Sequence, residues 1–222
     1  MKNYRTASQR VSRGDAMLTD NTKPQLLSPT LRALLWLTAL PASLVMAEPA
    51  DWEIDSEHFS IVFEAEHIGY QQQMGMFLEG SGEFRYDPET GELSGGRVEI
   101  AAESLFSNHD DRDEHLRGRD FLSANRHPLI VFAATGYTPS TGDMAHGTLS
   151  GNLTMLDETH PVELDVIINK RAEYPFGHRE ETLGISASTT IMRSRWGMDY
   201  GVSNDMVGDA VKLRFEFEAI RQ

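Results

Sequence analysis

Residues 211–219 read VKLRFEFEA, an unbroken alternation of apolar and charged side chains. Successive side chains on a β-strand point to opposite faces, so this pattern predicts a strand with one buried and one solvated face. A helix would distribute the same charges around its whole surface. Together with the same pattern elsewhere in the chain, the stretch favours an antiparallel sheet that is closed or nearly closed.

The same period-2 pattern recurs between turn signals along the rest of the chain. We predict eight strands: 52–66, 69–87, 97–105, 129–138, 145–156, 160–174, 182–193 and 211–220. Strands that follow one another without intervening helices indicate an all-β barrel or sandwich. An eight-stranded barrel is either filled by its own side chains or just wide enough for one small ligand.

Three local features modify this pattern. The phase slips near Gly80 and Gly82, which predicts a bulge or sharp bend in the second strand. Residues 108–123 are rich in charge and predict a short helical insert, with Asn108 as its N-cap. A short hairpin loop is expected at residues 157–159.

The first 47 residues resemble an export signal. An apolar run after Arg32 is interrupted by Pro41 and ends in small residues, so we predict cleavage between Ala47 and Glu48. The alternative is a membrane anchor, but the run is shorter than the roughly 20 residues that a span needs. The segment before the run is long, and a start at Met17 would shorten it. Residues 48–222 then form one domain, without a membrane span after cleavage.

Charge and composition exclude several functions. The full chain carries a net charge of −14, and residues 48–222 hold 14 basic and 32 acidic side chains, a net charge of −18. Such a surface repels phosphate backbones and anionic lipid surfaces, which argues against a nucleic-acid partner. The sequence has no cysteine, which excludes disulfides, thiolate nucleophiles and iron–sulfur clusters.

An ordered set of short motifs resembles the YceI-like family over roughly residues 51–220. The motifs are WEID (52–55), HIG (67–69), GMF (75–77), RDEHL (112–116), DF (120–121), HPLIVF (127–132), GNLT (151–154), PVEL (161–164), RSRWGM (193–198) and VGD (207–209). The resemblance implies an exported, lipocalin-like antiparallel β-barrel with an apolar pore for a polyisoprenoid or a similar long-chain lipid. It implies no catalysis and a periplasmic location. This chain departs from the pattern in a hairpin without glycine at 156–160 and in Trp196, where phenylalanine is usual.

Eight apolar residues are our candidates for contact with such a ligand, because strand alternation places them on the inner face. They are Phe63, Phe77, Phe132, Leu153, Val166, Ile185, Phe215 and Phe217. The alternative is that they simply fill the barrel. Periodicity identifies the inward face but does not say whether that face encloses a void.

Five polar residues are candidates for contact with a ligand head group: Arg112, Asp113, His115, Arg193 and Arg195. Arginine can bind phosphate through two parallel hydrogen bonds. The structural alternative is that Arg112 and Asp113 tie the helical insert to the barrel, and that Trp196 packing and arginine pairing hold the 193–196 loop. His58 and His67 are expected to be surface or hydrogen-bonded structural histidines.

No catalytic residue, cofactor or metal site is predicted. Asp111 and His115 share a helix face, but their spacing matches no standard zinc pattern. The favoured function is sequestration or transport of a long apolar ligand. An exported structural or stress-response protein with a filled barrel and an enzyme acting on such a lipid are the alternatives, and a homodimer paired through strand edges stays open.

Overall fold

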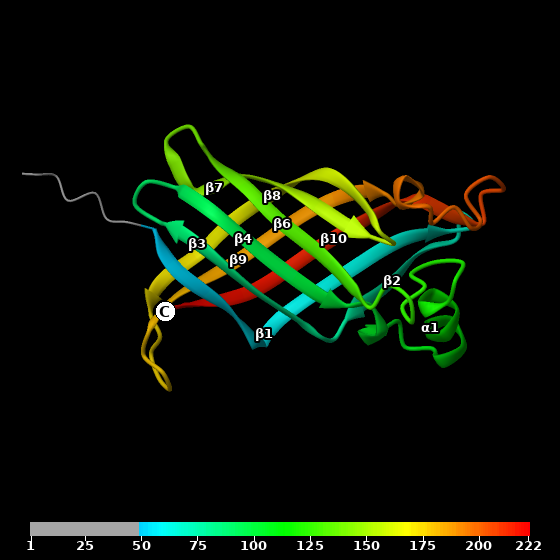
Figure 1. Cartoon of the computed structure of the whole chain (residues 1–222), viewed down its shortest axis with the longest axis horizontal. Coiled ribbons are helices and arrows are strands. Elements are labelled where there is room, and N and C mark those ends of the chain that lie inside the picture. Colours follow the sequence, from blue (N-terminus) through cyan, green and yellow to red (C-terminus); the bar gives the residue numbers. More distant parts are fainter. Residues whose placement is uncertain (1–48) are drawn as a thin grey trace, which may run out of the picture. The chain divides into compact units, whose positions relative to one another are not determined.

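The computed structural model describes residues 49–222, which form one closed antiparallel β-barrel with a single α-helix (Figure 1). The strands are β1 (Ala50–His67), β2 (Gln71–Phe77), β3 (Gly80–Asp87), β4 (Glu92–Ala101), β5 (Leu105–Phe106), β6 (Leu129–Ser140), β7 (Asp143–Met155), β8 (Glu158–Glu173), β9 (Glu181–Met192) and β10 (Val207–Arg221). The helix α1 spans Asp110–Arg117, and two 3₁₀ turns span Ala102–Ser104 and Arg193–Trp196.

The barrel closes because β1 pairs with β3 on one side and with β10 on the other. Each neighbour pair is hydrogen-bonded in the order β10-β9-β8-β7-β6-β4-β3-β1, and β1 pairs in turn with β10. β2 continues β3 along the same side of β1, so the ring has eight strand positions. The predicted eight-stranded antiparallel barrel with a short helical insert is confirmed.

The stretch at 211–219 behaves as its alternation predicts. In β10, Leu213, Phe215 and Phe217 line the interior, whereas Lys212 and Arg214 are exposed. Its register against β1 pairs Phe215 with Ile61, another interior residue, so the dry faces of both strands coincide.

The predicted phase slip is the break between β2 and β3 at residues 78–79. There the backbone N–H of Leu78 donates to the Ser104 carbonyl at 3.1 Å instead of continuing the ladder. A second irregularity in β1 has no counterpart in our predictions. Between Ile54 and Phe59 the register against β10 shifts, so residues 55–58 bulge out opposite Glu218.

The helical insert is shorter than predicted, and its assigned cap is wrong. Asn108 has a φ of +65°, which turns the chain before the helix begins. His109 is the N-cap, and its Nδ1 accepts from the Arg112 N–H at 3.4 Å. Residues after Arg117 form successive turns, held by bonds such as Ser123 N–H to Gly118 O at 2.8 Å.

The β7–β8 hairpin loop comprises residues 156–157 rather than 157–159. Leu156 and Asp157 have φ values of +52° and +65°, and Met155 pairs with Glu158. Two consecutive positive φ angles are typical of a tight type I′ turn, which normally favours glycine or asparagine. The hairpin therefore keeps its geometry with two non-glycine residues.

The signal-peptide prediction, with the cut at Ala47–Glu48 and the alternative start at Met17, lies outside the described residues. Within residues 49–222, no helix is both long enough and apolar enough to span a bilayer.

Candidate functional site: an apolar cavity in the barrel

The barrel encloses a cavity of about 440 Å³. This volume falls within the 300–1,000 Å³ that is typical of small-ligand sites. On β10 the lining residues extend from Val207 to Phe217, a path of roughly 33 Å at ~3.3 Å per residue. The cavity therefore follows most of the barrel, and its lining is overwhelmingly apolar.

All eight residues predicted for the inner face line this cavity: Phe63, Phe77, Phe132, Leu153, Val166, Ile185, Phe215 and Phe217. Strand alternation placed them on the inner face, and the structure adds the void that periodicity could not show. Their contact with a lipid stays a prediction.

Four aromatic rings pack closely against glycines of neighbouring strands. A methyl group added at any of these glycines would overlap the ring, which shows how closely the ring approaches the backbone. The pairs are Phe63 over Gly75, Phe59 over Gly80, Phe132 over Gly151 and Tyr137 over Gly147. We call this side, formed by β1, β2, β3, β6 and β7, the glycine-backed wall. Because the rings lie against the wall, they leave the interior open.

The opposite side is built differently. β8 and β9 present only aliphatic and small side chains to the cavity, and we call this the aliphatic wall. Its members are Val162, Leu164, Val166, Ile168, Ile185, Ala187, Thr189 and Ile191. Glycines within the strands were the sequence signal that could have predicted the glycine-backed wall. From the sequence we assigned a structural role only to Gly80 and Gly82.

Polar lining residues gather at the end of the barrel that carries α1 and the loop at 197–206, here called the helical end (Figure 1). Four lining residues at this end are exposed: His67, His115, Tyr200 and Met206. Two other exposed lining residues, Glu83 and Arg97, pair across β3 and β4, on the opposite sheet face from Phe84. The cavity therefore reaches solvent at the helical end.

Arg193 is buried at this end, with 3% of its surface exposed. Its guanidinium donates to four backbone carbonyls, those of Gly208 (2.9 Å), Met198 (2.6 Å), Tyr200 (2.8 Å) and Val207 (2.8 Å). Burial lowers the pKa of Arg193, against the opposing influence of Asp209 and Asp199. Carbonyls, not acids, hold this arginine, so it chiefly fastens the loop to the barrel.

Arg112 and Asp113 meet at Ser107 instead of pairing with each other. The Arg112 Nε donates to the Ser107 hydroxyl at 2.7 Å, and buried Asp113 accepts the Ser107 N–H at 2.8 Å. Arg117 lies 4.0 Å from Asp113 and donates to the Leu105 carbonyl at 2.9 Å. These contacts secure the insert to β5. Of the two head-group candidates Arg112 and Asp113, only Arg112 also borders the cavity.

The two remaining head-group candidates, His115 and Arg195, do not lie together in the structure. His115 borders the cavity, and its ring lies 5.1 Å from that of Tyr200 and 5.2 Å from that of Phe121. Arg195 is exposed outside the lining, with its guanidinium 5.4 Å from the centroid of Trp196. Trp196 itself is buried and donates its indole N–H to the Leu153 carbonyl at 3.1 Å. The structure thus brings Arg112, His115 and Arg193 to the cavity and leaves Asp113 and Arg195 outside it.

Tyr86 lines the other end of the cavity and was not among our predicted residues. Its side chain is buried, and its hydroxyl has no hydrogen-bond partner among the described residues. Burial raises the pKa of Tyr86 to about 12. Its ring packs edge-on against Tyr137 at 5.9 Å. An apolar pore needs no hydroxyl at this position, so the Tyr86 hydroxyl is a hydrogen-bond donor that is unpaired within residues 49–222 and has no evident packing role.

Known proteins resemble this chain over nearly all of the described residues. The family model described as the YceI-like domain matches residues 52–219. A UPF0312 protein of Pseudomonas aeruginosa (strain LESB58) is 33% identical over 202 residues, which cover 89% of this chain and 100% of that protein.

Solved structures share the fold. The Campylobacter jejuni YCEI protein superimposes with a TM-score of 0.63 at 26% identity, over 71% of this chain and 90% of that one. A polyisoprenoid binding domain from Saccharophagus degradans superimposes with a TM-score of 0.55 at 11% identity, over 77% of this chain and 98% of that domain. At 11% identity, the second likeness concerns the fold alone.

Proposed function

Because this chain belongs to the YceI-like family, we propose that its barrel binds a long apolar ligand of the polyisoprenoid class. The observation that carries the proposal is the elongated apolar cavity of about 440 Å³. A ligand of this kind is bound chiefly by burial, at about 0.8 kcal/mol for each CH₂ group removed from water. The Saccharophagus degradans domain, which is described as polyisoprenoid binding, has the same fold.

The ligand would place its polar end at the helical end and its chain toward Tyr86. Polar lining residues support this orientation, since Arg112, His115 and Tyr200 border the cavity where it reaches solvent. A binding role, not a catalytic one, fits a lining that is overwhelmingly apolar.

We also propose that the protein is exported to the periplasm and carries or sequesters its ligand there. The apolar run after Arg32, with small residues before Glu48, supports export. A closed barrel would shield an isoprenoid chain from water while the ligand crosses an aqueous compartment.

Native mass spectrometry of the protein purified from its own cell envelope tests the proposal, together with lipid analysis after denaturing extraction. We expect one isoprenoid or similar long-chain molecule per barrel. An unliganded mass under gentle conditions, with no uptake of added polyprenyl alcohol, would overturn the proposal. N-terminal sequencing of the same sample tests export, which predicts a mature chain that begins at Glu48.

Two variants on adjacent positions of β9 locate the bound chain. Ala187→Trp places an indole in the cavity, whereas Ser188→Trp places it on the exposed outer face. We expect the first variant to lose uptake of polyprenyl alcohol and the second to retain it. Equal uptake by both variants would mean that the ligand binds outside the barrel.

A further inference from the structure

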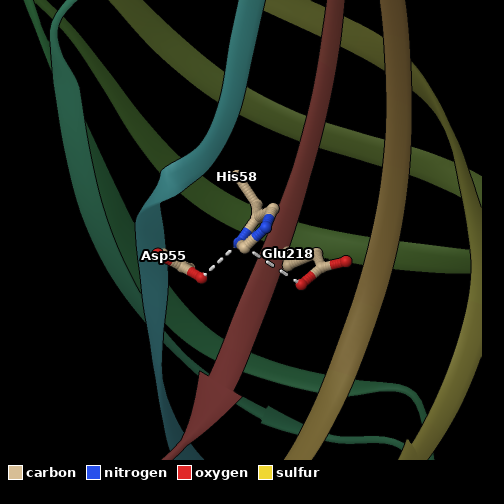
Figure 2. Close-up of side chains that lie close together, drawn as sticks. All are labelled: Asp55, His58 and Glu218. Atoms are coloured by element: carbon tan, nitrogen blue, oxygen red, sulfur yellow. Dashed lines mark hydrogen bonds and ion pairs between the residues drawn. The ribbon is translucent and has the colours of Figure 1, made fainter. Parts of the chain in front are cut away.

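Two carboxylates and one imidazole meet on the outer face of the barrel, away from the cavity lining (Figure 2). Asp55 and His58 come from the bulge in β1, and Glu218 comes from β10 directly opposite that bulge. Their candidate ligand atoms lie within 4.8 Å of one another. Within residues 49–222, this is the one group of three or more such side chains that could surround a single ion.

The β1 bulge creates this convergence. In a regular strand, side chains three apart project from opposite faces, so Asp55 and His58 could not meet. Here four residues, 55–58, stand opposite the single residue Glu218. Extra residues in a bulge redirect side chains, and bulges are frequent beside functional sites.

The separations suit a small transition-metal ion. His58 Nδ1 lies 2.7 Å from Asp55 Oδ2 and 3.8 Å from Glu218 Oε2. Bond lengths of about 2.0–2.2 Å around tetrahedral zinc require ligand atoms about 3.3–3.6 Å apart. The two observed separations bracket that value, and the Asp55 and Glu218 oxygens lie within 4.8 Å of each other. Shifts of up to roughly 1 Å in these side chains would therefore complete the site.

A hydrogen bond orients one of the three side chains, and all three are partly exposed to solvent. Asp55 Oδ1 accepts the Glu57 N–H at 2.9 Å, which directs Oδ2 toward the imidazole. The side chains of Asp55, Glu218 and His58 are 19%, 32% and 50% exposed. An ion held here would keep a solvent-facing position for water or another ligand, as in zinc sites with three protein ligands.

A second Asp-x-x-His segment in the barrel has the same hydrogen bonds but no third ligand among residues 49–222. At the β6–β7 hairpin, His146 Nδ1 lies 2.6 Å from Asp143 Oδ2, and Asp143 Oδ1 accepts the Ala145 N–H at 2.9 Å. The Asp-x-x-His turn alone therefore explains a histidine–aspartate pair. What distinguishes the β1 bulge is Glu218, contributed by another strand.

We propose that Asp55, His58 and Glu218 bind a divalent transition-metal ion of the zinc class on the outside of the barrel. One nitrogen and two oxygen ligands are a donor set that zinc accepts. The proposal is independent of what the cavity binds, because none of the three residues lines the cavity.

Titration of the tag-free protein with Zn²⁺, followed by calorimetry, tests this proposal, and the visible absorption of Co²⁺ reports the ligand geometry. We expect one ion per chain, with affinity reduced about tenfold or more in His58→Ala and in Glu218→Gln. The matched control is His146→Ala, which removes the histidine of the two-ligand turn and should leave the affinity unchanged.

Thermal unfolding of each variant without metal separates loss of binding from loss of folding, and the near-isosteric Glu218→Gln should fold normally. The proposal is overturned if the wild-type protein binds no stoichiometric ion, if Glu218→Gln binds as tightly as wild type, or if His146→Ala weakens binding as much as His58→Ala.

Discussion

The glycine-backed wall and the aliphatic wall line the same cavity by different means. On the first, large rings such as Phe132 are accommodated because glycines such as Gly151 let them lie against the backbone. On the second, β-branched and small residues such as Ile185 and Ala187 stay short of the barrel axis. The comparison teaches that hollowness has two sources, close approach of rings to the wall and short side chains on the wall.

The largest expected effect breaks the glycine-backed wall. In Gly151→Val the new side chain overlaps the Phe132 ring and approaches the Ala133 carbonyl. The ring must swing into the cavity or the backbone must shift, and we expect a loss of about 3 kcal/mol in the free energy of unfolding. Chemical denaturation measures this loss, and ligand uptake should fall with it.

Gly136→Val is the control for this prediction, because a side chain at Gly136 on β6 meets nothing within 4 Å. We expect this variant to stay within about 0.5 kcal/mol of wild type. If both glycine variants cost the same, the close approach of Phe132 is not what Gly151 provides. Phe132→Leu in the Gly151→Val background should recover part of the loss.

A smaller effect is expected on the aliphatic wall. Ile185→Ala removes three carbon atoms from a buried side chain that already borders open space. We therefore expect a cost of about 2 kcal/mol, at the low end for such truncations. The enlarged cavity should accept bulkier ligands than wild type, which competition between polyprenyl alcohols and branched analogues would reveal. A cost above about 4 kcal/mol would indicate a filled region at this position.

Glu181, the first residue of β9, makes a weaker, pH-dependent contribution to the free energy of unfolding. Glu181 on β9 contacts Arg171 at 2.5 Å and Arg221 at 2.7 Å. Burial alone would raise the pKa of Glu181, but hydrogen bonds from Arg221 and Arg171 outweigh it and hold the pKa below its ordinary value of 4.5. The folded state thus favours the ionised carboxylate, whose stabilisation is present above pH 4.5 and disappears as the pH falls through the lowered pKa.

Glu181→Gln should consequently cost less than about 1 kcal/mol at neutral pH, because the groups are partly exposed. Unfolding measured between neutral and acid pH should show the difference from wild type vanish in acid. A constant difference across that range would mean that the carboxylate charge is not the stabilising feature.

The smallest effect concerns the buried hydroxyl of Tyr86 on the glycine-backed wall. It has no partner among the described residues, so Tyr86→Phe should stabilise the unliganded protein by up to about 1 kcal/mol. Its neighbour Tyr137 donates to the Met144 carbonyl at 3.3 Å, and Tyr137→Phe should destabilise slightly. Opposite signs in thermal unfolding support this assignment, and a clear loss of stability in Tyr86→Phe contradicts it.

Much of the architecture could be predicted from the chain alone. Period-2 alternation in strands such as 211–219 specifies which side chains face inward, because the pleat reverses direction at every residue. The phase slip before Gly82 likewise marked the bend between β2 and β3. The start of the helical insert was harder to predict, because by residue type Asn108 is a better N-cap than His109, which occupies that position in the structure.

Other properties arose only when distant strands met. Periodicity is indifferent to volume, so whether Phe63 and Phe132 fill the barrel or lie against Gly75 and Gly151 depends on packing between strands. By residue type Arg193 was a candidate for contact with a ligand head group, but in the folded protein its guanidinium donates to four backbone carbonyls. Local alternation in the chain thus specified the inward face and the eight strand positions. The cavity and the outer cluster at Glu218 formed only on folding, because both depend on groups that are far apart in the chain.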